Sequence, residues 1–289
     1  MSKTRDILTS PRVEEIKRTK RKANIRLSVL FFVLFIVLVA GLSFLSNYKK
    51  MTINIIVVNG TRIINQSDVQ DFVEGKMSGK YLYMFNRHNA FIYPHDTIYD
   101  GLLKKFTRIE KLSLNVKNVN TLEIYIKERS GSYMWCGDKV PVNEEEKGEN
   151  CYFINDDGYI FDNAPYVSGN LYFKYYLPLA NAENILGSQM LSPEIFHNTI
   201  RLSDTIRESG LDPIMITEDA DYWYVHLNHR ESATSPYIIF RKDSDLDKVG
   251  EDIKLSMNQK EFRDEINGKY DTLLYIDMRF KNKVFYKFQ

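Results

Sequence analysis

One uninterrupted apolar segment stands out near the N-terminus. Residues 27–45, LSVLFFVLFIVLVAGLSFL, are 19 residues without a charge, close to the roughly 20 that an α-helix needs to cross a bilayer. A secretory signal peptide usually has a shorter apolar core, of about 7–15 residues, and a cleavage site made of small residues. This run instead ends in FLSNYKK. The pattern therefore predicts an uncleaved membrane-spanning helix rather than a cleaved signal peptide or a buried core helix.

Residues 51–129 alternate between strand-like and helix-like patterns. The β-branched run INIIVV is followed by the turn pair Asn59-Gly60, and the capping box SDVQ begins at Ser67. Apolar residues recur at helical spacing after Ser67 and again from Ile98 to Phe106, whereas IEKLSLNV and TLEIYIKE are apolar at every second position. We therefore expect strand, helix, helix, strand, strand, a small α+β domain with both helices on one face of a three-stranded sheet.

From residue 130 onward the pattern is mainly that of strands. CYFIN and YIF flank Asp156-Asp157-Gly158, in which Asp-Gly favours a two-residue hairpin turn. A helix is expected over residues 192–210, where Ser192 precedes Pro193, and another from Leu246 to about Met257, with an irregular continuation through Phe262 as an open alternative. The expected fold class is α+β. It comprises a basic tail (1–26), one transmembrane helix (27–45), a small β-α-α-β-β domain (51–129) and a mainly β domain with two helices (130–289).

Charge is distributed unevenly along a chain whose formal net charge is +1. Residues 1–26 carry nine Lys or Arg against three Asp or Glu, whereas only Lys49 and Lys50 directly follow the apolar run. The positive-inside rule then places the tail in the cytoplasm and residues 51–289 outside it. This outer part is net acidic, which argues against nucleic-acid binding. The basic run KRTKRK is better explained as a topology signal beside anionic lipid.

The two cysteines, Cys136 and Cys151, are separated by 14 residues that include NEEEKG. In an oxidising compartment a disulfide between them would close this polar loop and contribute on the order of 3 kcal/mol to stability. Two free thiols are the alternative. The disulfide is favoured because both cysteines adjoin aromatic, strand-like residues, and a thiol titration distinguishes the two states.

No pattern typical of a catalytic site emerges from the sequence. His226-x-x-His229 lacks the spacing and the glutamate of a zinc-binding helix, and on a strand its two rings would point to opposite faces. Asp156-Asp157 precedes a glycine and is typical of a turn rather than of the paired carboxylates of a hydrolase. Paired cysteines are not nucleophiles. We expect a protein that is not an enzyme and that uses no cofactor, metal or small-molecule substrate.

The closing hairpin, YIDMRFKNKVFYKF at residues 275–288, is rich in aromatic residues, which favour both strands and interfaces. If residues 284–288 form an edge strand, their backbone N–H and C=O groups are a template for a strand of another chain. The flanking lysines offer a second explanation, because lysines on an edge strand also guard against aggregation.

Taken in order, these features resemble the bitopic cell-division family FtsQ, called DivIB in Gram-positive bacteria. The first outer domain resembles the family's POTRA module, through VVNG at residues 57–60 and through the run 109–129. That run carries the family's Thr-Leu and Glu-Arg pairs as Thr121, Leu122, Glu128 and Arg129, but has Asn120 where the family usually has proline. FINDDGYIFD resembles the family's Asp-x-x-Gly hairpin, and residues 275–288 resemble its closing strand pair. Residues 81–93 are longer and more aromatic than expected for the family.

The resemblance implies a non-enzymatic scaffold of the divisome, anchored in the plasma membrane through residues 27–45 and gathered at the division septum. It implies partners of the FtsB/DivIC and FtsL type, one of which adds a strand to the last strand of the second domain. A proline or glycine at Phe285 is then expected to weaken binding while leaving the fold intact. The residues implied at the contact are Tyr275, Arg279, Phe280, Val284, Phe285 and Tyr286.

Two other functions fit parts of the pattern. A POTRA-bearing chaperone for secretion or outer-membrane assembly would share the first domain, but such proteins usually lead into a β-barrel, and no such segment is recognised. A membrane-anchored cell-wall hydrolase would share the anchor, but no catalytic pattern is recognised. Location distinguishes them, since a division scaffold is expected at midcell.

Overall fold

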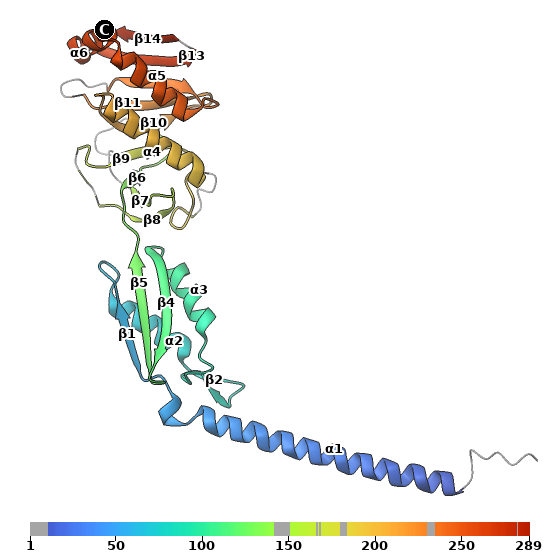
Figure 1. Ribbon diagram of the computed structural model, residues 1–289. Coiled ribbons are helices and arrows are strands. Elements are labelled where there is room, and N and C mark those ends of the chain that lie inside the picture. The colour runs from blue at the N-terminus through green and yellow to red at the C-terminus, as the bar shows by residue number, and fades with distance from the viewer. Residues whose placement is uncertain are drawn as a thin grey trace, which may run out of the picture. The chain divides into compact units, whose positions relative to one another are not determined.

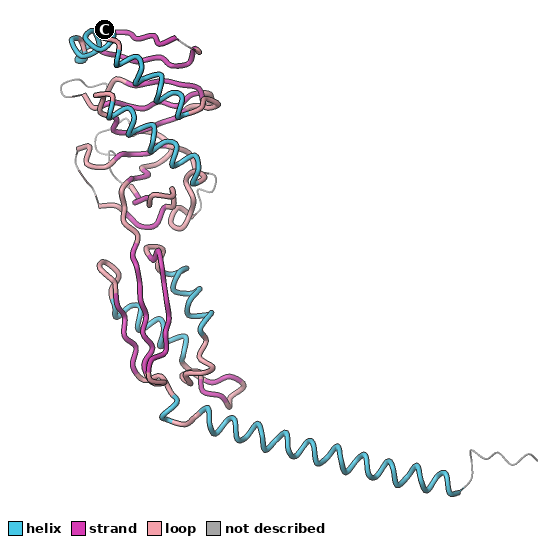
Figure 2. The backbone as a smooth tube through the Cα atoms, viewed as in Figure 1, coloured by secondary structure: helices cyan, strands magenta, loops and turns pink. Residues whose placement is uncertain are grey.

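The computed structural model describes residues 11–141, 151–165, 167, 169–179, 184–229, 235–281 and 283–289, with side chains from residue 18 onward. Figure 1 shows the elements in chain order, and Figure 2 separates helices, strands and loops by colour. The chain divides into two compact units, residues 1–102 with 111–126 and residues 103–110 with 127–289. The first unit ends at residue 126, and residues 103–110, which the sequence pattern assigns to the first domain, belong to the second unit. The fold is mixed α+β, as expected.

The first helix, α1 (Pro11–Ser46), begins in the basic tail and continues through the whole apolar run. From Arg18 to Ser46 it is long and apolar enough to cross a membrane, and none of its most apolar window is buried against the rest of the protein. A helix segment that is apolar on all sides and that no described residue of its own chain covers is typical of a membrane span. A short 3-10 turn, η2 (Lys49–Met51), follows directly.

The first unit contains a three-stranded sheet in the order β1-β5-β4, in which β1 runs parallel to β5. Buried residues occupy every second position of β5 and one face of each helix, as the sequence pattern predicts. The turn after β1 needs a glycine, because Gly60 has φ +87° and a Cβ there would lie 2.1 Å from the carbonyl oxygen of Ile126. The elements are β1 (Ile55–Asn59), α2 (Gln66–Met77), β2 (Lys80–Tyr81), β3 (Phe85–Asn86), α3 (His95–Lys105), β4 (Ile109–Lys117) and β5 (Thr121–Glu128).

Two details of this unit differ from the sequence-based expectation. The helix α2 begins two residues early, because Asn65 rather than Ser67 is its N-cap and accepts a hydrogen bond from the backbone amide of Ser67. The chain also inserts a short hairpin, β2 paired with β3, between the two helices. The strand, helix, helix, strand, strand order is otherwise present.

The second unit is built on a nine-stranded sheet in the order β14-β13-β12-β11-β10-β9-β6-β7-β8. Most neighbours are antiparallel, but β9 runs parallel to both β6 and β10, and β12 runs parallel to β13. The strands are β6 (Tyr133–Trp135), β7 (Tyr152–Ile154), β8 (Ile160–Asn163), β9 (Phe173–Tyr176), β10 (Pro213–Glu218), β11 (Tyr222–Leu227), β12 (Tyr237–Arg241), β13 (Leu273–Phe280) and β14 (Lys283–Phe288).

Three helices cover one face of this sheet (Figure 1) and enclose its hydrophobic core. They are α4 (Pro193–Glu208), α5 (Leu246–Asn258) and α6 (Lys260–Gly268), followed by the 3-10 turn η4 (Tyr270–Thr272). Ser192 caps α4 and accepts a hydrogen bond from the Ile195 amide, as its sequence predicts. The expectation of two helices is wrong, because the backbone turns extended at Gln259 and starts a separate helix there.

The turn between β7 and β8 is wider than the two residues expected. Asn155 closes it, because its side-chain oxygen accepts from the backbone amides of Asp157 and Tyr159 at 3.1 and 2.8 Å. Gly158 takes the left-handed conformation, with φ +81°. Asp156 and Asp157 are therefore turn residues.

A disulfide joins Cys136 and Cys151, which directly extend the antiparallel pair formed by Trp135 and Tyr152. Their Cα atoms lie 4.2 Å apart, and both residues are buried in a small apolar cluster. Most of the polar loop that they close, residues 142–150, lies outside the described residues.

Candidate functional site

The outermost strand at one side of the nine-stranded sheet is β14, which among the described strands pairs with β13 alone. The backbone amide of Gln289 donates to the carbonyl oxygen of Thr272, 2.8 Å away, so residue 289 points its backbone groups toward β13. Successive residues of a strand point these groups to opposite sides, so residues 283, 285 and 287 also point inward. The N–H and C=O groups of Val284, Tyr286 and Phe288 therefore line the open edge.

This direction corrects the expectation for Phe285. A proline at Phe285 would remove an amide that points toward β13, so it would damage the hairpin itself rather than the outer edge. The central outward amide belongs to Tyr286. A proline at that position would block the edge while keeping the ladder to β13.

The side chains of β14 divide between the two faces of the sheet. Val284, Tyr286 and Phe288 pack partly against the helix-covered core. The Tyr286 hydroxyl donates to Glu265 Oε2 of α6 at 2.6 Å, and its ring meets Phe262 edge to face. This hydrogen bond to Glu265 raises the pKa of Tyr286. The Tyr286 side chain is bound to α6, so only the backbone groups of Tyr286 are available to a partner strand.

Phe285 and Phe280 are the exposed aromatic residues of the hairpin. About half of each is exposed, 49% for Phe285 and 53% for Phe280, and their rings meet edge to face with centroids 5.4 Å apart. Phe285 pairs directly with Asp277 on β13, so it lies on the face that the helices leave uncovered. The two rings form an apolar patch beside the open edge, which suits a partner side chain.

Arg279 does not extend toward a partner but binds within its own strand. Its Nε donates to Asp277 Oδ1 at 2.9 Å and its Nη2 donates to Asp277 Oδ2 at 2.6 Å. The guanidinium also lies over the Tyr222 ring, 5.0 Å from its centroid. Burial acts to raise the pKa of Asp277, but the hydrogen bonds and charge of Arg279 outweigh it and hold that pKa below its usual value.

Tyr275 lies one strand away from the edge and is half-buried. Its ring stacks on Tyr237 of β12, with centroids 5.9 Å apart, and Tyr237 in turn meets Tyr224 of β11. The six predicted contact residues thus share one hairpin. Val284 and Tyr286 present their backbone groups at the edge, and Phe280 and Phe285 present their rings beside it. Arg279 and Tyr275 instead contact residues of the sheet itself.

The sequence interpretation missed two residues that shape this hairpin, Asp277 and Glu265. Asp277 carried a signal, since an acid two positions before an arginine on a strand lies on the same face. Glu265 lies in the helix that the sequence pattern did not resolve, so nothing local connected it with Tyr286.

The histidine pair does not form a site. His226 Nε2 lies 3.0 Å from Thr217 Oγ1, and burial lowers the pKa of His226 to about 4. His229 Nε2 lies 3.1 Å from the carbonyl oxygen of Asp271, and its ring stacks on Tyr270. Within the described residues no group of three or more His, Cys, Asp or Glu side chains is placed to hold a metal ion.

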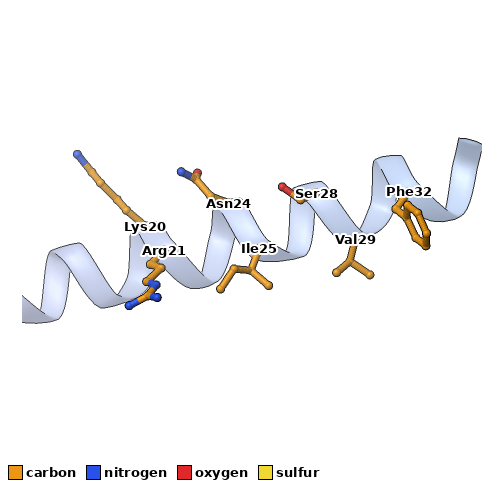
Figure 3. A pocket seen from close by; sticks show the side chains of 7 residues that line it. All are labelled: Lys20, Arg21, Asn24, Ile25, Ser28, Val29 and Phe32. Atoms are coloured by element: carbon orange, nitrogen blue, oxygen red, sulfur yellow. The ribbon is translucent and has the colours of Figure 1, made fainter.

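Two hollows on the surface carry no chemistry that points to a ligand. One is lined by seven residues that all belong to α1, from Lys20 to Phe32. Figure 3 shows these side chains projecting from a single helix, so the hollow is an open helix surface. The other lies between the starts of α4 and α5, where Arg201 is paired with Asp247 through two hydrogen bonds.

No family model matches this chain, and no curated protein shows significant sequence similarity to it.

Proposed function

We propose that this protein is a non-enzymatic, membrane-anchored scaffold of the bacterial division machinery, and that it binds a partner by strand addition at β14. The observation that carries the proposal is the outward row of backbone groups at Val284, Tyr286 and Phe288, next to the exposed rings of Phe280 and Phe285. Backbone groups on an open edge supply affinity for an added strand, and a neighbouring apolar patch supplies selectivity. The resemblance of the sequence to FtsQ and DivIB supplies the biological setting.

The anchor and its orientation complete the proposal. The helix α1 would cross the plasma membrane once, with the basic tail in the cytoplasm and both compact units outside, where a disulfide between Cys136 and Cys151 is stable. The first unit would be a POTRA-type module. Partners of the FtsB/DivIC and FtsL type would present an extended segment to the edge at the division septum.

The groups that line the open edge are backbone N–H and C=O groups, which suit strand addition. Lys283 and Lys287 are exposed and alternate with the core-packed residues of β14, so they lie on the face away from the core. They discourage nonspecific edge pairing and leave the ladder itself available. Lysines that guard the strand against aggregation are therefore compatible with an edge that accepts a specific partner.

A matched pair of variants tests the edge. Tyr286→Pro and Tyr286→Ala both remove the ring and its hydrogen bond to Glu265, but only the proline removes the outward amide. We expect a partner segment to bind the full chain in detergent with a Kd in the micromolar range or tighter, and the proline variant to bind at least about tenfold more weakly than the alanine variant. The probe is a peptide from the membrane-distal end of the host's FtsB/DivIC-like protein, and the measurement is isothermal titration calorimetry.

Equal affinities of the two Tyr286 variants would show that the β14 backbone is not the binding edge. A fluorescent fusion of the full chain provides the second test, since a division scaffold gathers at midcell. A uniform distribution around the cell envelope would contradict the divisome assignment and favour the chaperone alternative.

A further inference from the structure

The hairpin β2–β3 exposes large apolar side chains at its tip. Leu82 is 81% exposed, Tyr83 is 96% exposed and Met84 is 40% exposed, and the nearby Phe91 is 74% exposed. Hairpin tips usually carry Gly, Asn, Asp or Ser. A cluster of bare aromatic and aliphatic residues on such a tip is typical of an interaction surface.

The backbone of the tip reinforces this interpretation. Leu82 and Tyr83 have φ values of 48° and 62°, in the left-handed region that favours glycine or asparagine. A leucine and a tyrosine at these two positions strain the turn, although a glycine would fit it easily. Strain of this kind at a surface turn points to side chains with a function.

The hairpin is fixed to the last turn of α1. Ser43 Oγ and Asn47 Nδ2 both donate to the carbonyl oxygen of Met84, at 3.0 and 2.9 Å. The backbone amide of Asn86 donates to Ser46 Oγ at 2.9 Å. Figure 1 shows the hairpin beside this end of α1, where the two elements are in contact.

A second set of bonds closes the junction between this segment and the helix. Asn89 Nδ2 donates to the carbonyl oxygen of Ser46 at 3.2 Å, and its Oδ1 accepts from the amide of Phe91 at 3.0 Å. Ser46 and Asn89 are only 6% and 4% exposed. The segment from β2 to Phe91 is therefore held at the helix end by buried, paired polar groups.

These bonds set the height of the tip relative to the apolar run. Ser43 lies inside the run 27–45, two residues before its end. The Met84 carbonyl that it contacts is therefore level with the last apolar turn of α1. If α1 crosses a bilayer, this turn lies at the boundary between acyl chains and headgroups, where tyrosine and tryptophan are enriched.

The charges around the hairpin fit a lipid surface. Lys49 and Lys50 follow α1, Lys80 begins the hairpin, and the Arg87 guanidinium lies over the Tyr81 ring, 4.8 Å from its centroid. Exposed apolar side chains flanked by Lys and Arg are the composition of segments that lie in a membrane interface. A protein partner would have to reach this tip at the level of the lipid headgroups, so lipid is the occupant that the position favours.

We propose that the β2–β3 hairpin, through Leu82, Tyr83 and Met84, together with Phe91, inserts into the interface of the leaflet at which α1 ends. It is a second membrane contact that fixes the first unit on the bilayer surface. The inference rests on the membrane anchoring by α1 in the proposed function, but not on the division partners.

Tryptophan reporters in the full chain test the insertion. The native Trp135 and Trp223 both lie buried in the second unit, so the wild-type signal is subtracted as background. The variants are Tyr83→Trp and Phe91→Trp for the hairpin, Phe35→Trp for the middle of α1 and Leu171→Trp as an exposed position of the second unit. Each is reconstituted into phosphatidylcholine and phosphatidylglycerol vesicles, with and without lipids brominated near the glycerol end of the acyl chains.

We expect bromolipid to reduce the emission of the two hairpin reporters, Tyr83→Trp and Phe91→Trp, by about twofold or more, because collisional quenching needs contact with the acyl chains near the interface. The emission of the Leu171→Trp reporter should not change. Lipids brominated near the methyl end should quench the Phe35→Trp reporter more than the Tyr83→Trp reporter.

Two outcomes would overturn the proposal in different ways. A quenched reporter in the middle of α1, together with unquenched reporters in the hairpin, would overturn the hairpin proposal while leaving the anchor intact. An unquenched reporter in the middle of α1 would overturn the anchor, and the hairpin proposal with it.

Discussion

Arg279 keeps Asp277 ionised inside the sheet, one strand from its open edge. Asp277 is 4% exposed, and its carboxylate receives two side-chain hydrogen bonds from Arg279. An ionised carboxylate at such a depth is stable only when it is paired. The Asp277–Arg279 pair therefore stabilises β13, the strand with which β14 pairs.

Arg279→Gln should destabilise the second unit by about 2–3 kcal/mol, because it leaves a buried carboxylate without its cation. This expected loss of stability is smaller than for a fully buried ion pair, because one-third of the Arg279 side chain is exposed. Arg279→Lys, which keeps the charge but loses the two-fold hydrogen bond, should cost less. Urea unfolding of the full chain in detergent, followed by the fluorescence of Trp135 and Trp223, measures both. A loss below about 0.5 kcal/mol for Arg279→Gln would show that the pair is solvated and contributes little.

Removal of the disulfide should lower stability by about 3 kcal/mol, the value expected for a closed loop of this length. Cys136 and Cys151 are 15 positions apart in the sequence. The double variant Cys136→Ala, Cys151→Ala should unfold at a lower urea concentration than the oxidised protein. Dithiothreitol should shift the wild type to a similar midpoint and leave the double variant unchanged. A wild type that does not respond to reductant, with two titratable thiols, would establish the free-thiol alternative.

His226 should make the second unit sensitive to mild acid. Burial lowers its pKa from 6.5 to about 4 in the folded protein. The unfolded chain therefore binds a proton that the folded protein excludes, so stability is complete above about pH 6.5 and decreases as the pH falls toward 4. The loss over this window should be on the order of 2 kcal/mol.

His226→Gln removes the titrating group and keeps a polar side chain near Thr217. Its urea midpoint should be nearly independent of pH between about 6.5 and 4.5, in contrast to the wild type. His229→Gln is the matched control, because the His229 ring does not take part in the half-buried contact between His226 and Thr217. A wild type whose stability is constant over this window would contradict the buried neutral state of His226.

Helices and strands with a regular apolar pattern were predictable from the sequence. A hairpin or a helix break that no Gly, Pro or Asn marks was not. The apolar periodicity of α2, α3 and α4 and the alternation of β5 identify these elements. The hairpin β2–β3 was missed because Leu82 and Tyr83 occupy positions where the usual signal is Gly or Asn. The break between α5 and α6 was missed because neither Gly nor Pro marks Gln259.

The strand that carries the candidate site was predictable from the sequence, but its neighbours in the sheet were not. Alternation in residues 284–288 indicates a strand, and the strand order places it at the edge of the described sheet. The order of the nine strands depends on parallel pairing between segments far apart in sequence, such as β12 with β13, which no local pattern encodes. The register of β14 against β13 determines which backbone groups of β14 face outward. The hydrogen bond from the Gln289 amide to the Thr272 carbonyl oxygen shows this register, and composition does not encode it.

Asn89 should determine how firmly the β2–β3 segment is held to α1. Asn89→Ala leaves the carbonyl of Ser46 and the amide of Phe91 without their side-chain partner in a buried junction, a loss of about 1–3 kcal/mol in local stability. Amide hydrogen exchange in residues 84–92 of the full chain should then accelerate about 5- to 150-fold, since local opening becomes easier by that free energy.

Asn65→Ala is the matched control. It removes only the cap of α2, so its effect should be confined to the first turn of that helix. Unchanged exchange at residues 84–92 in Asn89→Ala would mean that the bonds from Ser43 and Asn47 to Met84 hold the hairpin without Asn89.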